Sequence, residues 1–209
     1  MKRAFLLTAL LLISVFSIWA QTTAFVGVNV IPMDSERVLA NQTVIVRNGT
    51  IAEIGDAAKV KVPKDAFTVD GKGKYLMPGL VDMHTHLLSD NDDYPDSIAP
   101  DELRVMVANG VTTVRFMIGT PELLKLRERS AAQEIAAPTI FVASPHLTGR
   151  KQGNDFVVTN PDEAREAVRK SKAAGYDFIK VTTFVPSLIY EAAVEEAAKQ
   201  NIRVVGHAD

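Results

Sequence analysis

The 209-residue sequence contains no cysteine. This absence excludes disulfide frameworks, thiolate metal sites, iron–sulfur clusters and a cysteine nucleophile. Any metal ion must therefore be held by nitrogen and oxygen ligands. The sequence also has no large excess of one charge. It contains 23 lysine and arginine residues and 25 aspartate and glutamate residues, which give a formal net charge of −2. The sequence thus lacks the basic footprint of a nucleic-acid-binding protein.

Three common functional motifs are missing as well. There is no Gly-x-Gly-x-x-Gly, no Walker-type Gly-Lys-Ser/Thr and no Gly-x-Ser-x-Gly, which disfavours nucleotide binding and serine hydrolysis. What is present is an ordinary globular composition, with 47% hydrophobic and 23% charged residues. The length predicts one to two domains of roughly 100–200 residues each.

The amino-terminal residues predict a signal peptide over residues 1–20. A basic Met1-Lys2-Arg3 start precedes a charge-free stretch that ends at Ala20, and the small Ala20 before the polar Gln21 is typical of a cleavage site. An uncleaved membrane anchor is the alternative, because the stretch is about as long as a short membrane span. We therefore expect an exported protein, periplasmic or secreted, that meets the membrane only through this segment.

Residues 21–75 have the pattern of a small β-domain, an incomplete β-sandwich. Asn48-Gly49 lies between the β-type runs 43–47 and 50–55, which is a strong hairpin signal. Two further strands are expected at 24–31 and 66–69. No stretch of this region has a long helical period.

Residues 76–209 alternate between apolar strand-like runs and amphipathic helical stretches, a pattern that predicts an α/β fold with a parallel sheet. An eight-stranded α/β barrel takes about 250 residues, so only about five strands fit here. We expect the amino-terminal part of a TIM-like (β/α)8 barrel, and we interpret the chain as a fragment. The expected strands are 80–86, 112–116, 138–144, 178–182 and 203–207, and the expected helices are 100–108, 121–129, 161–174 and 186–200.

Two of the four histidines form the pair His84-Thr85-His86 at the end of the first of these strands. Because side chains alternate along a strand, Asp82, His84 and His86 are expected on one face. Active sites of parallel barrels assemble at the carboxyl ends of the strands, where two imidazoles can share one divalent cation. The alternative is a pair of solvated histidines, because His-x-His is a short pattern with frequent chance matches.

Lys180 lies in an apolar strand, where an unpaired ammonium group is costly. Its side chain either reaches the rim of the sheet or loses its charge. His207 ends the fifth expected strand and reaches the same rim. We expect four side chains to meet at the carboxyl ends of the parallel strands: His84, His86, Lys180 and His207. A chance match could explain any one of them, but it explains the whole group less well.

Two more residues are candidates for a supporting role beside the metal ligands or the substrate, Asp82 and His146. His146 follows the third expected strand, on a loop that runs to Asp155, and could line a substrate-binding mouth. A solvated loop histidine is the alternative.

The segment from Tyr75 to His86, Tyr-Leu-Met-Pro-Gly-Leu-Val-Asp-Met-His-Thr-His, closely resembles the amidohydrolase superfamily of metal-dependent hydrolases. Residues 46–55 resemble the superfamily's amino-terminal β-sandwich, and residues 110–115 resemble its second barrel strand. Residues 175–181 are most similar to the branch that holds imidazolonepropionase and the Xaa-Pro, Xaa-Arg and Xaa-Lys dipeptidases. The resemblance covers essentially the whole chain after the signal segment.

This resemblance implies two divalent metal ions, with zinc as the first expectation, and a carboxylated lysine at Lys180. His84 and His86 would hold the more buried ion, Lys180 would bridge both ions as a carbamate, and His207 would bind the second ion. Manganese, iron and cobalt accept the same ligands. The implied reaction is hydrolysis of an amide or other C–N bond by a metal-activated water, in a small-molecule or dipeptide-like substrate. Whether the protein is a homo-oligomer stays open.

The superfamily also supplies a metal-binding histidine from the sixth strand and a catalytic aspartate from the eighth, and this chain contains neither. We therefore expect the 209 residues alone to be inactive and poorly soluble, without a general base and with an open sheet edge. Phe116 in place of a common aspartate, and Gly149-Arg150-Lys151 in place of a common Gly-Gly-His loop, leave the substrate undefined.

Two alternatives to an amidohydrolase remain at this point. The same fold and the same activated water could hydrolyse esters, lactones or phosphotriesters. A truncated barrel could instead bind a small molecule or a partner without catalysis.

Overall fold

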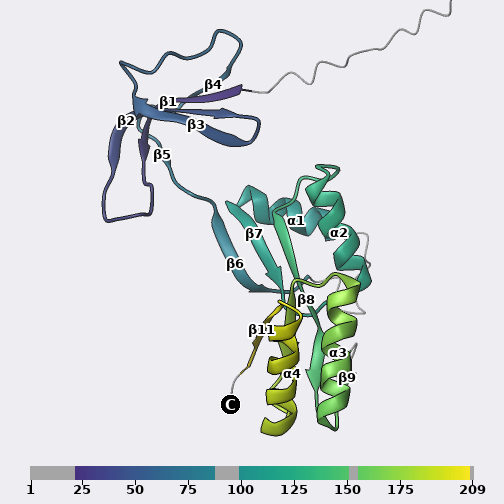
Figure 1. Cartoon of the computed structure of the whole chain (residues 1–209). Coiled ribbons are helices and arrows are strands. Elements are labelled where there is room, and N and C mark those ends of the chain that lie inside the picture. The colour runs from purple at the N-terminus through teal and green to yellow at the C-terminus, as the bar shows by residue number, and fades with distance from the viewer. Residues whose placement is uncertain (1–21, 88–98, 151–154, 208–209) are drawn as a thin grey trace, which may run out of the picture. The chain divides into compact units, whose positions relative to one another are not determined.

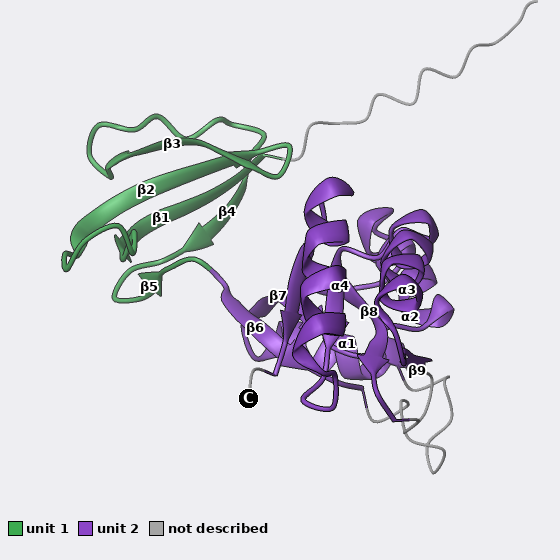
Figure 2. Cartoon of the chain, turned by 60° about the horizontal axis from the view of Figure 1, so that its bottom comes forward, with its two compact units in different colours: residues 1–78 green, residues 79–209 purple. Residues whose placement is uncertain are grey.

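The computed structural model describes residues 22–87, 99–150 and 155–207 (Figure 1). The expected signal segment, 1–20, lies outside these residues. The chain divides between Pro78 and Gly79 into two compact units (Figure 2). No helix in the described ranges is long and apolar enough to cross a bilayer.

Unit 1 is built on a five-stranded sheet with the order β3-β2-β1-β4, and β5 pairs with the far end of β1. Its small core is formed by valines of β1 and β2, namely Val28, Val30 and Val44. The strands are β1 (Thr22–Val30), β2 (Leu39–Arg47), β3 (Thr50–Asp56), β4 (Phe67–Asp70) and β5 (Tyr75–Leu76).

The hairpin expected at Asn48-Gly49 is present. Strands β2 and β3 are antiparallel, and Arg47 pairs with Thr50 across the two-residue turn. Asn48 has φ 52° and Gly49 has φ 73°. Both central residues are therefore left-handed, as a type I′ turn requires, and Asn-Gly is the sequence that adopts this turn most readily.

Unit 2 contains a parallel sheet with the order β11-β10-β8-β7-β6, and β9 pairs with β8 off this path. The expected fold class is confirmed: the unit is α/β, with five parallel strands of a partial TIM-like barrel. Its strands are β6 (Leu80–Thr85), β7 (Val111–Phe116), β8 (Thr139–Thr148), β9 (Asp155–Val157), β10 (Phe178–Val181) and β11 (Arg203–Gly206). Its helices are α1 (Ala99–Ala108), α2 (Pro121–Ala131), α3 (Pro161–Ala174) and α4 (Ser187–Lys199).

The third strand differs from its expected extent. The sequence predicts an end at Ser144, whereas β8 continues to Thr148 and is joined there by β9, which the sequence does not predict. Pro145 suggests a strand end because it cannot donate to the ladder. It is tolerated here because the register with β10 shifts at this point, and bulges accept proline.

Two of the helices begin at residues whose side chains cap them. The Thr120 hydroxyl accepts from the backbone N–H of Leu123 at the start of α2, and Asn160 caps α3 before a proline in the first turn. Gly175 ends α3 with φ 90°, the left-handed conformation that glycine adopts without strain. Helix α4 starts after Pro186 without a side-chain cap.

Two hydrophobic cores lie between the sheet and the helices. One packs Ile140 and Val142 of β8 with residues of α1, α2 and β7, and the other packs Leu147 of β8 with residues of α3, α4 and β10. Because strand side chains alternate, the opposite face of the sheet carries the polar and aromatic residues between these positions. The expected site residues belong to that opposite face.

Candidate metal centre at the carboxyl ends of the strands

Three of the expected histidines come together at the carboxyl ends of the two outermost strands of the main sheet path. The ring centroids of His84 and His86 are 5.4 Å apart, and those of His84 and His207 are 5.8 Å apart. His84 is in β6, His86 follows it directly, and His207 follows β11. The far ends of a curved sheet thus bring residues over 120 positions apart in sequence to one place.

Gly206 lets His207 approach the neighbouring strand. The backbone N–H of His207 donates to the Val181 carbonyl at 3.2 Å. A Cβ atom on Gly206 would lie 2.0 Å from the same carbonyl oxygen. Any side chain at this position would therefore push the end of β11 away from β10 and move His207 with it.

The spacing of the rings suits imidazoles that bind metal. A Zn–N bond is about 2.0–2.1 Å, and two rings on one tetrahedral ion then have centroids about 5 Å apart. Within the described residues, no three His, Asp or Glu side chains form a complete metal-binding group by themselves. A site here therefore needs Lys180 or further donors, as the resemblance implies.

Lys180 provides the strongest indication that this site holds a further chemical group, because its buried amine has no hydrogen-bond partner among the described residues. Its side chain is 1% exposed, and Nζ has no hydrogen-bond partner among the described residues. Burial lowers the pKa of the amine, and the positive charge of Arg115 lowers it further. The backbone at this position is fixed, because the Lys180 N–H donates to the Ser144 hydroxyl at 3.0 Å. The side chain is thus a buried, unpaired amine with a reduced tendency to be charged.

Arg115 places a permanent cation on the same face. Its Nε donates to the Met83 carbonyl at 2.8 Å, and its guanidinium carbon lies 5.2 Å from the ring centroid of Phe178. Phe178 is two residues before Lys180 on β10 and shares its face. Arg115 therefore ties the end of β6 to β10 across the sheet.

The pKa of His84 is also lowered. Desolvation is the main cause, followed by the positive charges of Lys180, His86, His207 and Arg115. Neutral imidazole is the form that binds metal. The surroundings of His84 therefore favour the metal-binding state.

Asp82 has a local role in the structure. Its Oδ1 accepts from the backbone N–H of His84 at 3.0 Å. The carboxylate thereby fixes the chain immediately before the histidine pair. The supporting role expected for Asp82 beside a metal ligand or a substrate stays a prediction.

The expectation of a loop at His146 is wrong. His146 lies in β8, in register with Asp155 of β9 and with Lys180 of β10. Its Nδ1 is 3.2 Å from Asp155 Oδ1, and the two side chains are 16% and 2% exposed. Burial lowers the pKa of His146, the Asp155 charge raises it, and the charges of Lys180 and His86 lower it. His146 is therefore a partly buried residue beside Lys180 and not a solvated loop histidine.

Sequence reasoning missed Arg115 and Asp155 as residues of this region. Strand alternation could have placed Arg115 on the inward face, two residues from Thr113. Asp155 carried no such signal, because β9 is only three residues long and lies where the sequence predicts the end of a loop. Residues 151–154, with Lys151 of the expected loop, lie outside the described residues.

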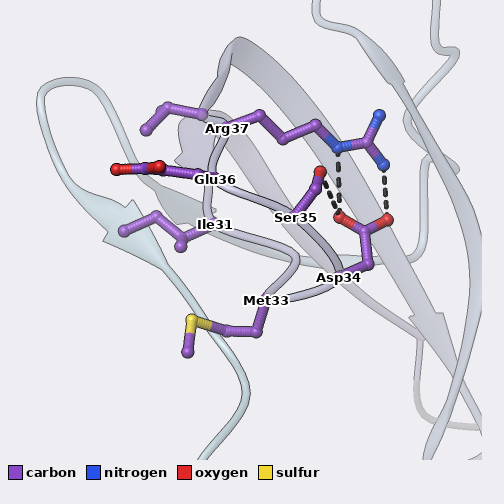
Figure 3. A pocket seen from close by; sticks show the side chains of 7 residues that line it. Ile31, Met33, Asp34, Ser35, Glu36 and Arg37 are labelled. Carbon is purple, nitrogen blue, oxygen red and sulfur yellow. Dashed lines mark hydrogen bonds and ion pairs between the residues drawn. The ribbon is translucent and has the colours of Figure 1, made fainter.

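Unit 1 contains a separate hollow formed by the segment that connects β1 to β2, lined by Ile31 and residues 33–38 (Figure 3). Two of its three charged side chains, those of Asp34 and Arg37, are paired with each other. Arg37 donates to both carboxylate oxygens of Asp34, and the Ser35 hydroxyl donates to Oδ1 at 3.2 Å. Arg37 thereby lowers the pKa of Asp34. The lining residues thus do not form a cluster of free reactive groups.

Residues 75–209 match the model of the amidohydrolase family. This match spans well over half of the sequence and includes every residue of the candidate metal centre. The chain belongs to the amidohydrolase family. The rim of histidines and lysine described above lies within the matched residues.

Individual relatives agree with the family assignment. A dihydroorotase of Anaeromyxobacter sp. (strain K) is 38% identical over 79 residues, 38% of this chain and 18% of the relative. A dihydroorotase of Syntrophobacter fumaroxidans is 26% identical over 179 residues, 79% of this chain and 37% of the relative. The crystal structure of a putative prolidase from Bifidobacterium longum is 25% identical with a TM-score of 0.78, and the match covers 90% of this chain and 50% of that one. The chain thus spans half or less of the length of these relatives.

Proposed function

We propose that the protein is a hydrolase that cleaves an amide or related C–N bond with the help of two divalent metal ions, and that Lys180 is carboxylated and lies between them. The observation that carries this proposal is the buried Lys180 amine, which has no partner among the described residues and lies on the rim with three histidines. An unpaired buried polar group costs free energy, so its retention calls for a partner.

Carboxylation accounts for the amine on chemical grounds. Burial and Arg115 disfavour the ammonium form, which leaves a neutral amine able to react with carbon dioxide. The product is an anion, and an anion near Arg115 is stabilised where a second cation is not. A carbamate also supplies two oxygen ligands, which complement the nitrogen ligands of the histidines.

In this proposal, His84 and His86 bind one ion and His207 binds the other. Asp82 holds the His84 backbone, and Gly206 permits the approach of His207 to β10. When bound, the ions supply a water of lowered pKa and polarise the carbonyl of the substrate. The residues described here hold this centre and orient its ligands.

The names of the relatives agree with attack on a C–N bond, because they include dihydroorotase and prolidase. The proposed substrate is a small molecule or a dipeptide-like compound. Export through the amino-terminal segment is part of the same proposal, since that segment has the charge pattern of a signal peptide.

Elemental analysis tests the proposal. Protein expressed from the complete reading frame should contain about two divalent ions per chain. Lys180→Ala should lose most of this metal, whereas Lys125→Ala, which removes an exposed lysine on α2, should retain it. Short carboxylic acids should partly restore metal to Lys180→Ala by standing in for the carbamate.

A well-folded protein without stoichiometric metal would contradict the proposal. If metal is present, a panel of amides, dipeptides, esters, lactones and phosphotriesters identifies the bond that is cleaved. Turnover of esters or phosphotriesters alone would overturn the assignment to C–N bonds while leaving the metal centre in place.

A further inference from the structure

A bulge in β8 brings His146 opposite Lys180. Across the β8–β10 pair, Phe178 aligns with Ala143 and Lys180 aligns with His146, so three steps on β8 match two on β10. The extra residue lies in Ser144-Pro145. In an unbroken strand, alternation would turn His146 toward the helices, because Ile140 and Val142 already face them. Because of the bulge, the side chain of His146 instead lies on the same face of the sheet as that of Lys180.

Asp155 fixes the imidazole of His146 from the other side. It is opposite His146 in the β8–β9 register, and its carboxylate, 2% exposed, lies 3.2 Å from Nδ1. A carboxylate only accepts hydrogen bonds, so Nδ1 carries the proton in this pair. In a neutral ring, Nε2 is then a hydrogen-bond acceptor.

We propose that His146, oriented by Asp155, is a positioning residue that accepts a hydrogen bond from the carboxylated side chain of Lys180. This inference rests on the proposed function, because it concerns the carbamate proposed there. It adds two residues, from β8 and β9, to a centre otherwise built from β6, β10 and β11.

The chemistry of carboxylation leaves the hydrogen that this bond needs. The amine nitrogen of Lys180 attacks the carbon of carbon dioxide, a C–N bond forms, and one C=O π pair moves to oxygen. One amine proton passes to solvent, and the nitrogen keeps one hydrogen. That N–H is a donor with no partner of its own, and the neighbouring strand places an imidazole acceptor opposite it. The bond would fix the plane of the carbamate, and with it the direction of both oxygens.

The test compares three variants in protein from the complete reading frame: His146→Phe, His146→Gln and Asp155→Asn. The ¹³C NMR signal of the carbamate is measured after exchange with ¹³C-bicarbonate, together with metal content and metal affinity. His146→Phe keeps a planar ring but has no acceptor, so it should lose most of the carbamate signal. Its metal affinity should fall about tenfold or more, as is typical for loss of an orienting residue.

The two milder variants identify the cause of any loss. His146→Gln keeps an acceptor oxygen near the position of Nε2 and should restore much of the signal. Asp155→Asn should give a carbamate signal between those of wild type and His146→Phe, because the imidazole of His146 is kept but is no longer held by a charged carboxylate. Asp65→Asn, an exposed carboxylate in unit 1, is the matched control and should resemble wild type. Thermal unfolding of each variant checks that all of them fold.

The outcomes separate this inference from the proposed function. Wild type with two ions and a carbamate, beside a folded His146→Phe with an undiminished signal, would overturn the role of His146 and leave the function standing. An equal loss of carbamate signal in His146→Phe and His146→Gln would also overturn the role of His146, since a hydrogen-bond acceptor at this position would then make no difference. Wild type without metal or carbamate would overturn both.

Discussion

At the scale of single residues, the charge environment of Lys180 decides much of the chemistry. Its amine is buried, has no partner among the described residues, and shares a sheet face with the guanidinium of Arg115. Without the carboxyl group this arrangement lowers the stability of the fold, because the buried amine has lost its hydrogen bonds to water and makes no others in their place. With an anionic carbamate the same arrangement becomes favourable. The role proposed for Lys180 therefore comes with a cost in stability to the metal-free protein.

We predict that Lys180→Met stabilises the metal-free protein in buffer free of carbon dioxide. Removing a buried unpaired polar group should contribute about 1–3 kcal/mol, which raises the thermal midpoint by several degrees for a protein of this size. Differential scanning calorimetry measures the change, with Lys125→Met as the exposed control. A lowered midpoint would show that the amine has a stabilising partner.

The stability of metal-free wild type and of Lys180→Met should depend differently on pH, and the sign of the difference follows from the pKa of Lys180. The pKa of Lys180 is lowered in the folded state, so in the window between that value and about 10.4 the unfolded chain binds more protons. Wild-type metal-free protein should therefore gain stability as pH rises through this window and lose it as pH falls. Lys180→Met should lack this contribution. Urea unfolding at several alkaline pH values measures it, and identical slopes would refute a lowered pKa.

At the scale of single elements, α3 has the most complete amino-terminal cap. Asn160 Oδ1 accepts from the backbone N–H groups of Asp162 and Glu163, and the Glu163 carboxylate accepts from the N–H and hydroxyl of Thr159. The Asn160 contacts satisfy two of the donors that a helix start leaves unpaired, and the Glu163 contacts tie the residue before the cap to the first turn. Helix α4, by contrast, has no side-chain cap at Pro186.

Asn160→Ala should therefore destabilise the protein by about 1 kcal/mol. Ser187→Ala, at the uncapped start of α4, is the control and should have a much smaller effect. Chemical denaturation followed by circular dichroism compares the two. An equal effect at both positions would mean that the Asn160 side chain contributes nothing as a cap.

These elements also show what a sequence can predict. Caps and turns at Thr120, Asn160, Gly175 and Asn48-Gly49 were predictable because each depends on a few adjacent residues. The extension of β8 and the short β9 were not, because they depend on pairing between segments distant in sequence.

The candidate site divides in the same way. The identity of His84, His86, Lys180 and His207 as candidates came from strand ends and spacing, and the structure brings the three histidines together. The expected loop position of His146 was wrong because Pro145 suggested a strand end, whereas β8 continues through a bulge that shifts its register with β10. The pairing of Asp155 with His146 followed from that shift and was equally hidden.

At the scale of the whole molecule, unit 2 presents open sheet edges within the described residues. Strand β6 pairs only with β7, and β11 pairs only with β10. Leu80, Val81 and Met83 on β6 are 50–54% exposed. An edge strand with exposed apolar side chains invites pairing with another chain.

We predict that the 209-residue chain self-associates at micromolar concentration, and that Val81→Lys reduces this. A lysine on an edge strand opposes pairing through charge and desolvation cost. Light scattering after size exclusion gives the mass. Val105→Lys, at a comparably exposed position on α1, is the control and should not change association. A monomeric wild type, or the same effect from both variants, would refute the role of the β6 edge.

The membership of β8 in both hydrophobic cores has a consequence for cooperativity. Ile140 and Val142 hold its first half in the core of α1 and α2, and Leu147 holds its second half in the core of α3 and α4. If either core opens alone, β8 remains anchored in the other, so its amide hydrogens should be among the last to exchange with deuterium. His146 lies near the junction of the two. The residue proposed to steady Lys180 would then stay in place during partial openings that release the histidines at the edges of the sheet.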